Sequence, residues 1–215
     1  AAMSGRIAAL AARVEDDGKV TIFVGAASGG VWKSDDGGTS FTPKFDKQPV
    51  QSIGAVALDP TNKQTVWVGT GESWTRNSVS VGNGIYKSTD GGDNWTLMGL
   101  PNVERITKIV VHPTNGNIVY ACAPGALWSD SPDRGLYKTS DGGKTWTQIK
   151  PVTSPPARNN ASMAYDSLRS RTILFGGSSG GDETWEWDGT NWTEVKPNTS
   201  PPARSETAIA YDSAR

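Results

Sequence analysis

The chain has 215 residues and a formal net charge of −1, with 21 Lys and Arg against 22 Asp and Glu. This balance of charges argues against a nucleic-acid-binding protein and against a polybasic membrane binder. No apolar run is close to the length of about 20 residues that is needed to span a bilayer. One Cys and one His argue against a zinc enzyme, and no cofactor or metal is predicted.

Three segments of the chain align without gaps and predict a repeat protein. They are Gly30–Phe41, Gly84–Trp95 and Gly135–Trp146. Each begins with a glycine, an apolar residue, an aromatic residue and a lysine. A Ser or Thr, one variable residue and an Asp-Gly-Gly turn follow, and a second aromatic residue stands three positions after the second turn glycine. The Asp residues of successive turns are 54 and 51 residues apart. A period near 50 residues is the length of one four-stranded propeller blade.

Upstream of each motif lie two short apolar stretches that are typical of strands. They cover residues 6–11 and 21–25, then 52–57 and 65–69, then 105–111 and 117–121. Clusters of Asp, Asn, Pro and Gly separate the two members of each pair and favour tight turns. Each unit therefore predicts strand A, a turn, strand B, a loop, strand C, an Asp turn and strand D.

The turn between strands C and D has a clear physical logic. Its Asp can accept hydrogen bonds from backbone N–H groups of the same turn, and the Gly pair permits positive φ. We expect the aromatic that opens strand D to pack beside the aromatic of strand C. The motif resembles the Asp-box, or bacterial neuraminidase repeat.

Because the same Asp recurs in every blade, whereas a catalytic residue is needed once, we expect the Asp-box residues to stabilise turns. We do not expect their carboxylates to bind metal or to act in catalysis. The residues in question are Ser34, Asp36, Gly38, Phe41, Ser88, Asp90, Gly92, Trp95, Thr139, Asp141, Gly143 and Trp146.

After Lys150 the repeat pattern changes. Lys150–Arg158 recurs as Lys196–Arg204, at an offset of 46 residues. The stretches between the two copies, with a diglycine after the second strand, resemble a kelch repeat. Residues 206–211 predict one more strand, the first of a further blade.

The predicted fold is all-β: a β-propeller of about four four-stranded antiparallel blades plus one extra C-terminal strand. Residues 1–149 resemble three Asp-box blades of sortilin-like or glycosidase-like propellers, and residues 150–215 resemble one kelch-like blade and the start of another. We expect the two parts to form one propeller unit. The change of pattern suggests a chimeric or engineered chain. The families that it resembles are secreted bacterial proteins, although the chain shows no signal peptide pattern.

Two long B–C loops carry the candidate binding residues, because this resemblance places ligands on the face that these loops form. The residues are Glu72, Trp74 and Arg76 in the second blade, and Trp128, Asp130 and Arg134 in the third. A Trp beside Arg and carboxylates suits sugar stacking or peptide anchoring. The alternative is that each Trp covers its own blade.

The expected function is a non-enzymatic propeller scaffold. One alternative is a module that binds carbohydrate or peptide. The other is a fragment of an Asp-box glycosidase with Glu72 or Asp130 as the acid, although the spacing of carboxylates selects no catalytic pair.

The number of blades predicts self-association. Wedges of about 45–60° are typical of rings with six to eight blades, so four of them leave the ring open. We therefore expect a homodimer that closes the ring, with a four-bladed monomer as the alternative.

Overall fold

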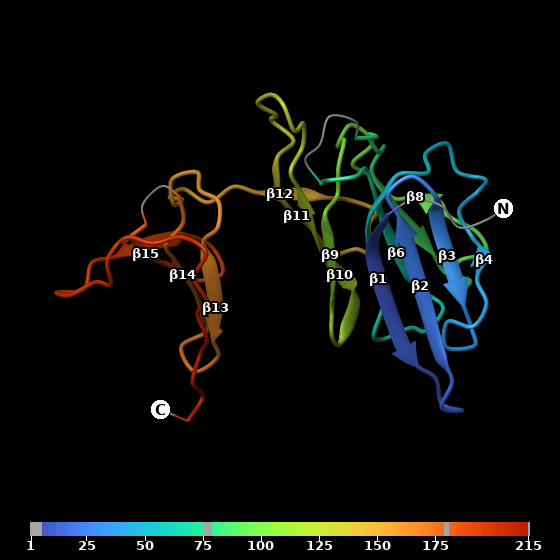
Figure 1. Cartoon of the computed structure of the whole chain (residues 1–215), viewed down its shortest axis with the longest axis horizontal. Coiled ribbons are helices and arrows are strands. Elements are labelled where there is room, and N and C mark those ends of the chain that lie inside the picture. The colour runs from blue at the N-terminus through green and yellow to red at the C-terminus, as the bar shows by residue number, and fades with distance from the viewer. Residues whose placement is uncertain (1–5, 75–78, 179–180, 215) are drawn as a thin grey trace. The chain divides into compact units, whose positions relative to one another are not determined.

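The computed structural model describes residues 6–74, 79–178 and 181–214. These residues form sixteen strands and no helix, and none of them lies in a helix that could cross a membrane. The strands make four antiparallel sheets, each of four consecutive strands (Figure 1). The predicted all-β fold with four four-stranded propeller blades is confirmed.

We number the sheets as blades 1 to 4, and in each the strands follow the order A to D. Blade 1 consists of β1 (Ile7–Val14), β2 (Val20–Ala26), β3 (Gly30–Ser34) and β4 (Thr42–Pro43). Blade 2 consists of β5 (Ile53–Leu58), β6 (Val66–Thr70), β7 (Ile85–Ser88) and β8 (Thr96–Leu97). Blade 3 consists of β9 (Lys108–His112), β10 (Asn115–Ala123), β11 (Gly135–Thr139) and β12 (Thr147–Ile149). Blade 4 consists of β13 (Ser162–Asp166), β14 (Arg171–Phe175), β15 (Thr184–Trp187) and β16 (Trp192–Val195).

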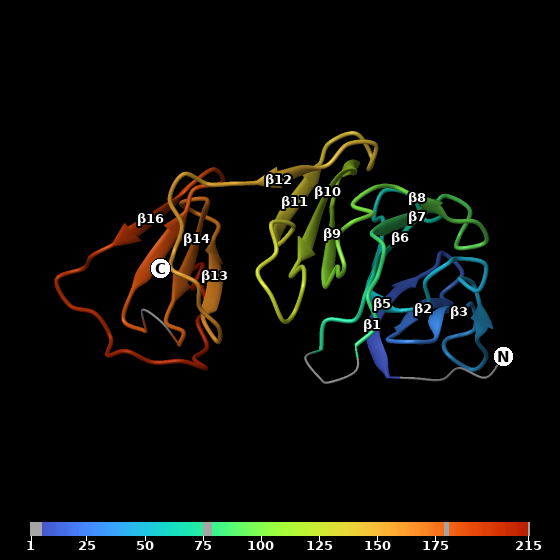
Figure 2. The same ribbon diagram turned by 90° about the horizontal axis from the view of Figure 1, so that it is seen from above.

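The chain divides into two compact units, residues 1–149 with blades 1 to 3 and residues 150–215 with blade 4. In the first unit β1 contacts β5 and β5 contacts β9, so the A strands of successive blades are neighbours (Figure 2). That both units form one propeller stays a prediction.

The hydrophobic core of the first unit lies between its blades. A single sheet has two faces, and each must be covered by another layer. Side chains alternate along β6, so Val66 and Val68 belong to the cluster shared with blade 1, whereas Trp67 belongs to the cluster shared with blade 3. Both faces of blade 2 are therefore buried, and all five residues of β6 are buried.

Two glycines let neighbouring blades approach closely. A Cβ on Gly25 would lie 2.6 Å from Cγ2 of Ile53, and a Cβ on Gly69 would lie 2.4 Å from Cγ2 of Ile106. Ile53 is the first residue of strand A in blade 2, and Ile106 lies just before strand A of blade 3. At both junctions this isoleucine contacts a strand B glycine of the preceding blade.

Blade 4 has a smaller core, in which Leu174 and Trp185 are buried. The predicted extra strand at residues 206–211 does not form. The segment instead lies along the start of β13, where Glu206 donates its backbone N–H to the carbonyl of Asn160 at 3.0 Å. In blades 1 to 4 strand A pairs with its own strand B, and residues 206–211 have no such partner among the described residues.

We predict that Gly69→Ala lowers the free energy of unfolding by about 1–3 kcal/mol, because the new methyl group overpacks the contact with Ile106. Denaturant unfolding of the purified variant measures this. In the Gly69→Ala background, Ile106→Ala should cost less than it does in the wild type. Strictly additive effects would contradict the proposed contact.

Candidate functional site

The Asp-box turns share one hydrogen-bond network, and the second turn illustrates it. The buried Ser88 Oγ accepts hydrogen bonds from the backbone N–H groups of Gly92 at 2.8 Å and Asp90 at 3.3 Å, and it donates to Asp90 Oδ1 at 2.8 Å. Asp90 in turn accepts from the backbone N–H of Asn94 at 2.9 Å and from its Nδ2 at 2.7 Å. The same bonds recur at Ser34, Asp36 and Ser40 and at Thr139, Asp141 and Thr145.

These hydrogen bonds favour the ionised carboxylates. The backbone and side-chain donors of Asn94, with the Ser88 hydroxyl, lower the pKa of Asp90 to about 2. The Ser40 hydroxyl likewise lowers the pKa of Asp36, and the Thr145 hydroxyl lowers the pKa of Asp141. Both pKa values lie well below the usual range for an aspartate. A carboxyl group with so low a pKa is a poor proton donor near neutral pH. No cluster of three or more His, Cys, Asp or Glu side chains that could hold a metal was found in residues 6–74, 79–178 and 181–214.

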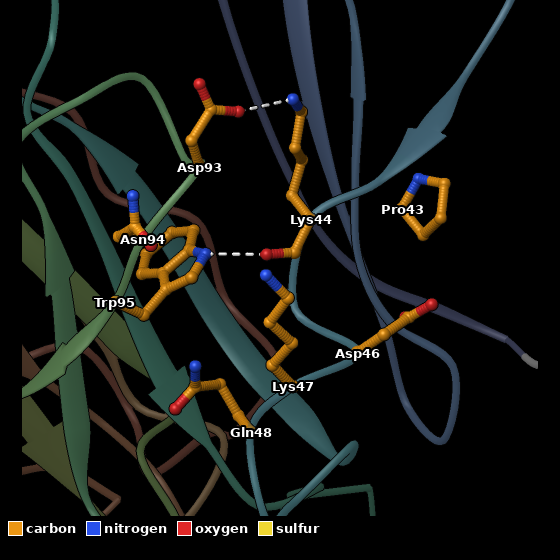
Figure 3. Close-up of a pocket in the computed structure, with 8 residues that line it drawn as sticks. All are labelled: Pro43, Lys44, Asp46, Lys47, Gln48, Asp93, Asn94 and Trp95. Carbon is orange, nitrogen blue, oxygen red and sulfur yellow. Dashed lines mark hydrogen bonds and ion pairs between the residues drawn. The ribbon is translucent and has the colours of Figure 1, made fainter.

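The aromatic that closes each Asp-box packs on the preceding blade. Trp95 donates its indole N–H to the carbonyl of Lys44 at 2.7 Å (Figure 3). Its ring also meets Phe45 edge-on, with centroids 5.2 Å apart. Trp146 likewise donates to the carbonyl of Met98 at 2.9 Å and meets the ring of Trp67.

The prediction that these aromatics pack beside the strand C aromatic is therefore wrong. In the ladder between β7 and β8 it is Leu97 that lies opposite Tyr86. Trp95 precedes β8, so it lies outside the ladder and is available to the neighbouring blade.

A cavity of about 380 Å³ lies beside Trp95, between the end of blade 1 and the Asp-box turn of blade 2 (Figure 3). Its lining residues are Pro43, Lys44, Asp46, Lys47, Gln48, Asp93, Asn94 and Trp95. Lys44 Nζ forms an ion pair with Asp93 at 2.6 Å, and the carbonyl of Lys44 accepts from Trp95. Groups that line this cavity thus bond to one another across the junction, which indicates a structural contact between blades.

The B–C loops of blades 2 and 3 emerge from the same end of their sheets (Figure 1). Each carries an exposed indole: Trp74 is 64% exposed and Trp128 is 69% exposed. The guanidinium of Arg6 lies 5.7 Å from the ring centroid of Trp74, within the range of a cation–π contact. Arg76, the other candidate on the blade 2 loop, lies outside the described residues.

Glu72 lies beneath the blade 2 loop and not on its surface, because its side chain is only 1% exposed. It forms an ion pair with Arg6, and its backbone carbonyl accepts a hydrogen bond from Arg105 Nε at 3.0 Å. Arg105 also pairs with Glu104. These bonds join the start of blade 1, the blade 2 loop and the connection into blade 3.

Arg134 closes the blade 3 loop on itself. Its guanidinium donates to the carbonyls of Pro124 at 2.7 Å, Ala126 at 2.8 Å and Ser129 at 3.2 Å. Asp130 is exposed on the same loop. Of the predicted binding residues, Trp74, Trp128 and Asp130 are therefore exposed to solvent. Glu72 and Arg134 instead make contacts that hold the two loops in place.

Sequence reasoning missed the two arginines Arg6 and Arg105. The signal was present, because each directly precedes the isoleucine that opens the strand A region of its blade.

A family model described as Sortilin, neurotensin receptor 3 (Sortilin-Vps10) matches residues 29–150 and, in a second overlapping match, residues 83–198. The chain is 33% identical over 111 residues to a xyloglucanase of Hypocrea jecorina, a match that covers 47% of the chain and 12% of the relative. It is 26% identical over 153 residues to a xyloglucanase of Paenibacillus sp., covering 64% of the chain and 14% of the relative.

Solved structures show the same fold. An ancestral GH74 enzyme superposes with a TM-score of 0.62 at 18% identity, covering 92% of this chain and 25% of that one. The GH74 enzyme of Niastella koreensis gives a TM-score of 0.54 at 24% identity, covering 81% of this chain and 27% of that one.

These relatives correct one prediction. The expectation that the chain is not an enzyme is wrong, because the curated proteins that it resembles are xyloglucanases. The family match supports the Asp-box interpretation of the repeats.

We predict that Ser88→Ala lowers the free energy of unfolding by about 1–3 kcal/mol, since it removes the acceptor of the buried Gly92 N–H. Denaturant unfolding measures the loss. Ser88→Thr is the matched control and should retain most of the stability, because Thr139 makes the same bonds in the third turn. Equal losses in both variants would contradict the hydrogen-bond account.

Stability should fall in acid. The native pKa values of the Asp-box carboxyls lie below the ordinary value of 3.8, so the folded protein binds fewer protons than the unfolded chain. Their contribution is then complete above about pH 5 and is lost progressively toward about pH 2. Urea midpoints from pH 7 to pH 2 measure this, and Asp90→Asn should flatten the acid slope. A wild-type midpoint that does not change in acid would contradict the assignment.

Proposed function

Because the chain belongs to the Sortilin-Vps10 family, and because its relatives include xyloglucanases, we propose that it forms part of the propeller of a glycoside hydrolase that acts on xyloglucan or a related β-glucan. The chain spans 12% and 14% of the length of the two relatives described above. We therefore assign to these 215 residues a part of the substrate-binding surface.

The exposed indoles of Trp74 and Trp128 are the observation that carries this proposal. An indole ring offers a flat apolar face with one polar edge, which suits the apolar face of a pyranose ring and its hydroxyl rim. Large exposed apolar groups at one end of a propeller indicate a binding surface. A β-glucan is an extended polymer, so a chain of several sugars is a suitable ligand for two separate aromatic platforms.

The support beneath the loops fits a binding role. Arg6 holds Trp74 from one side by a cation–π contact and Glu72 by an ion pair, and the Arg134 bonds close the blade 3 loop. Such contacts reduce the entropy that a loop loses when a ligand binds.

The carboxylates on this end make different contributions. Glu72 and Glu104 are each paired with an arginine, so we assign them to loop support. Asp130 is exposed, and we propose that it contacts sugar hydroxyls.

Two finer points belong to the same proposal. Xyloglucan is a large polysaccharide, so we place the protein outside the cell. We retain the kelch-like interpretation of blade 4 because its diglycine, Gly176 and Gly177, has positive φ at both positions. A chimeric origin of the chain stays a prediction.

We predict that the chain binds xyloglucan oligosaccharides and that Trp74→Ala and Trp128→Ala each weaken binding by about tenfold or more, as expected for loss of about 1.4 kcal/mol or more. Isothermal titration calorimetry measures the affinities. Tyr165→Ala is the control, because Tyr165 is an exposed aromatic on β13 and not on a B–C loop. If neither xyloglucan nor cello-oligosaccharides bind, or if both Trp variants bind like the wild type, the proposal is wrong.

A further inference from the structure

In each blade of the first unit, the residue before the strand A isoleucine bonds to Glu72. These residues are Arg6, Ser52 and Arg105. Arg6 forms an ion pair with the carboxylate of Glu72, and Ser52 Oγ accepts a hydrogen bond from its backbone N–H at 3.0 Å. Arg105 Nε donates to its carbonyl, also at 3.0 Å. All three blades therefore hold the base of the blade 2 loop.

The connection from blade 2 to blade 3 also holds both ends of this loop. Ile106 donates its backbone N–H to the carbonyl of Thr70 at 3.0 Å, directly before the loop. The carbonyl of Glu104 accepts from the backbone N–H of Gly82 at 2.7 Å, near the end of the loop. Gly71 has a φ of +90°, and a Cβ at this position would clash with the carbonyl oxygen of Glu104. The backbone of the connection is therefore fixed relative to the blade 2 loop.

The side chain of Arg105 extends this support to the blade 3 loop. It is only 4% exposed and forms an ion pair with Glu104. Besides its bond to the carbonyl of Glu72, it donates from Nη1 to the carbonyl of Gly125 at 3.3 Å, at the start of the blade 3 loop. A guanidinium is planar, and its N–H donors point in fixed directions. One buried side chain thus connects the bases of both loops.

The two exposed indoles follow these carbonyls closely in the chain. Trp74 comes two residues after Glu72, and Trp128 comes three residues after Gly125. Two weak sites bind one long ligand much more tightly than either site alone, but only if their spacing lets both engage at once. Ordering the loops before the ligand binds also reduces the entropy cost of binding.

We propose that Arg105 is a positioning residue that holds the two loops at a fixed separation, so that Trp74 and Trp128 contact one glucan chain at the same time. The observation that carries this inference is the pair of hydrogen bonds from one guanidinium to the carbonyls of Glu72 and Gly125. The inference rests on the proposed function and adds that the surface selects long glucan chains over short ones. Arg105 acts through the loops and does not touch the sugar.

The first test needs no ligand. Spin labels on Ser73→Cys and Ser129→Cys, in a Cys122→Ser background that removes the only native cysteine, report the distance between the loops by double electron–electron resonance. We expect a narrow distance distribution when Arg105 is present and a broader one in Arg105→Met. Equal distributions overturn the proposal.

Two further variants make this test specific. Arg105→Lys keeps the positive charge beside Glu104, but a single ammonium lacks the fork geometry of the guanidinium, so it should also broaden the distribution. It remains informative if Arg105→Met fails to fold. Arg13→Met is the matched control, because Arg13 is a partly buried arginine that pairs with Glu15 at the A–B turn of blade 1. It should leave the distances unchanged, and an equal broadening in this control overturns the proposal.

The second test compares ligands of different length by NMR titration. Cellobiose is the ligand for one indole, and xyloglucan oligosaccharides of several repeating units are the ligands for both. Arg105→Met and Arg105→Lys should weaken binding of the long oligosaccharides by about tenfold or more and that of cellobiose by less than about twofold.

An equal loss for both ligands overturns the proposal, because Arg105 would then act on each indole separately. If the wild type binds neither ligand, the proposed function fails. The label distances alone then decide whether Arg105 couples the two loops.

Discussion

The packing of the second Asp-box glycine on an aromatic ring of the preceding blade is the contact on which the first unit depends. A four-stranded sheet has no core of its own, so its stability comes from the layers on either side. Gly92 on Phe23 and Gly143 on Trp67 let these layers approach to van der Waals distance, and the turn must hold its shape for the glycines to fit. The Ser88 and Thr139 hydroxyls and the Asp carboxylates fix that shape.

The candidate binding face is a consequence of this arrangement. Strands B and C in blades 2 and 3 are fixed by their junctions, so the B–C loops emerge from one end of a rigid set of sheets. Arg6 and Arg105 then connect three blades through Glu72. Loops on a rigid scaffold are where binding residues concentrate, and here the two exposed indoles lie on loops supported by buried ion pairs and carbonyl contacts.

Much of this could be predicted from the sequence, because local chemistry determines it. The Asp-Gly-Gly motif gives the C–D turn, and the period near 50 residues gives the blade. The direction of Trp95 and Trp146 could not be predicted, since strand register alone does not say which neighbouring blade a residue outside the ladder meets. The roles of Glu72 and Arg134 were missed for a related reason: a charged residue in a loop can face solvent or bond to the loop's own carbonyls, and only tertiary structure decides. The strand predicted at residues 206–211 failed because a strand needs a partner, which the local pattern does not supply.

Hydrogen exchange of three equivalent amides tests the central claim most directly. The N–H groups of Gly38, Gly92 and Gly143 all donate to the Ser or Thr hydroxyl of their own turn, at 2.8 to 3.0 Å. Only Gly92 and Gly143 also lie on an aromatic ring of a preceding blade. If blade packing stabilises the turns, these two amides should exchange only with global unfolding of the unit, and the Gly38 amide should exchange much faster. Equal exchange at all three glycines would show that the turns are stable on their own and would contradict this account.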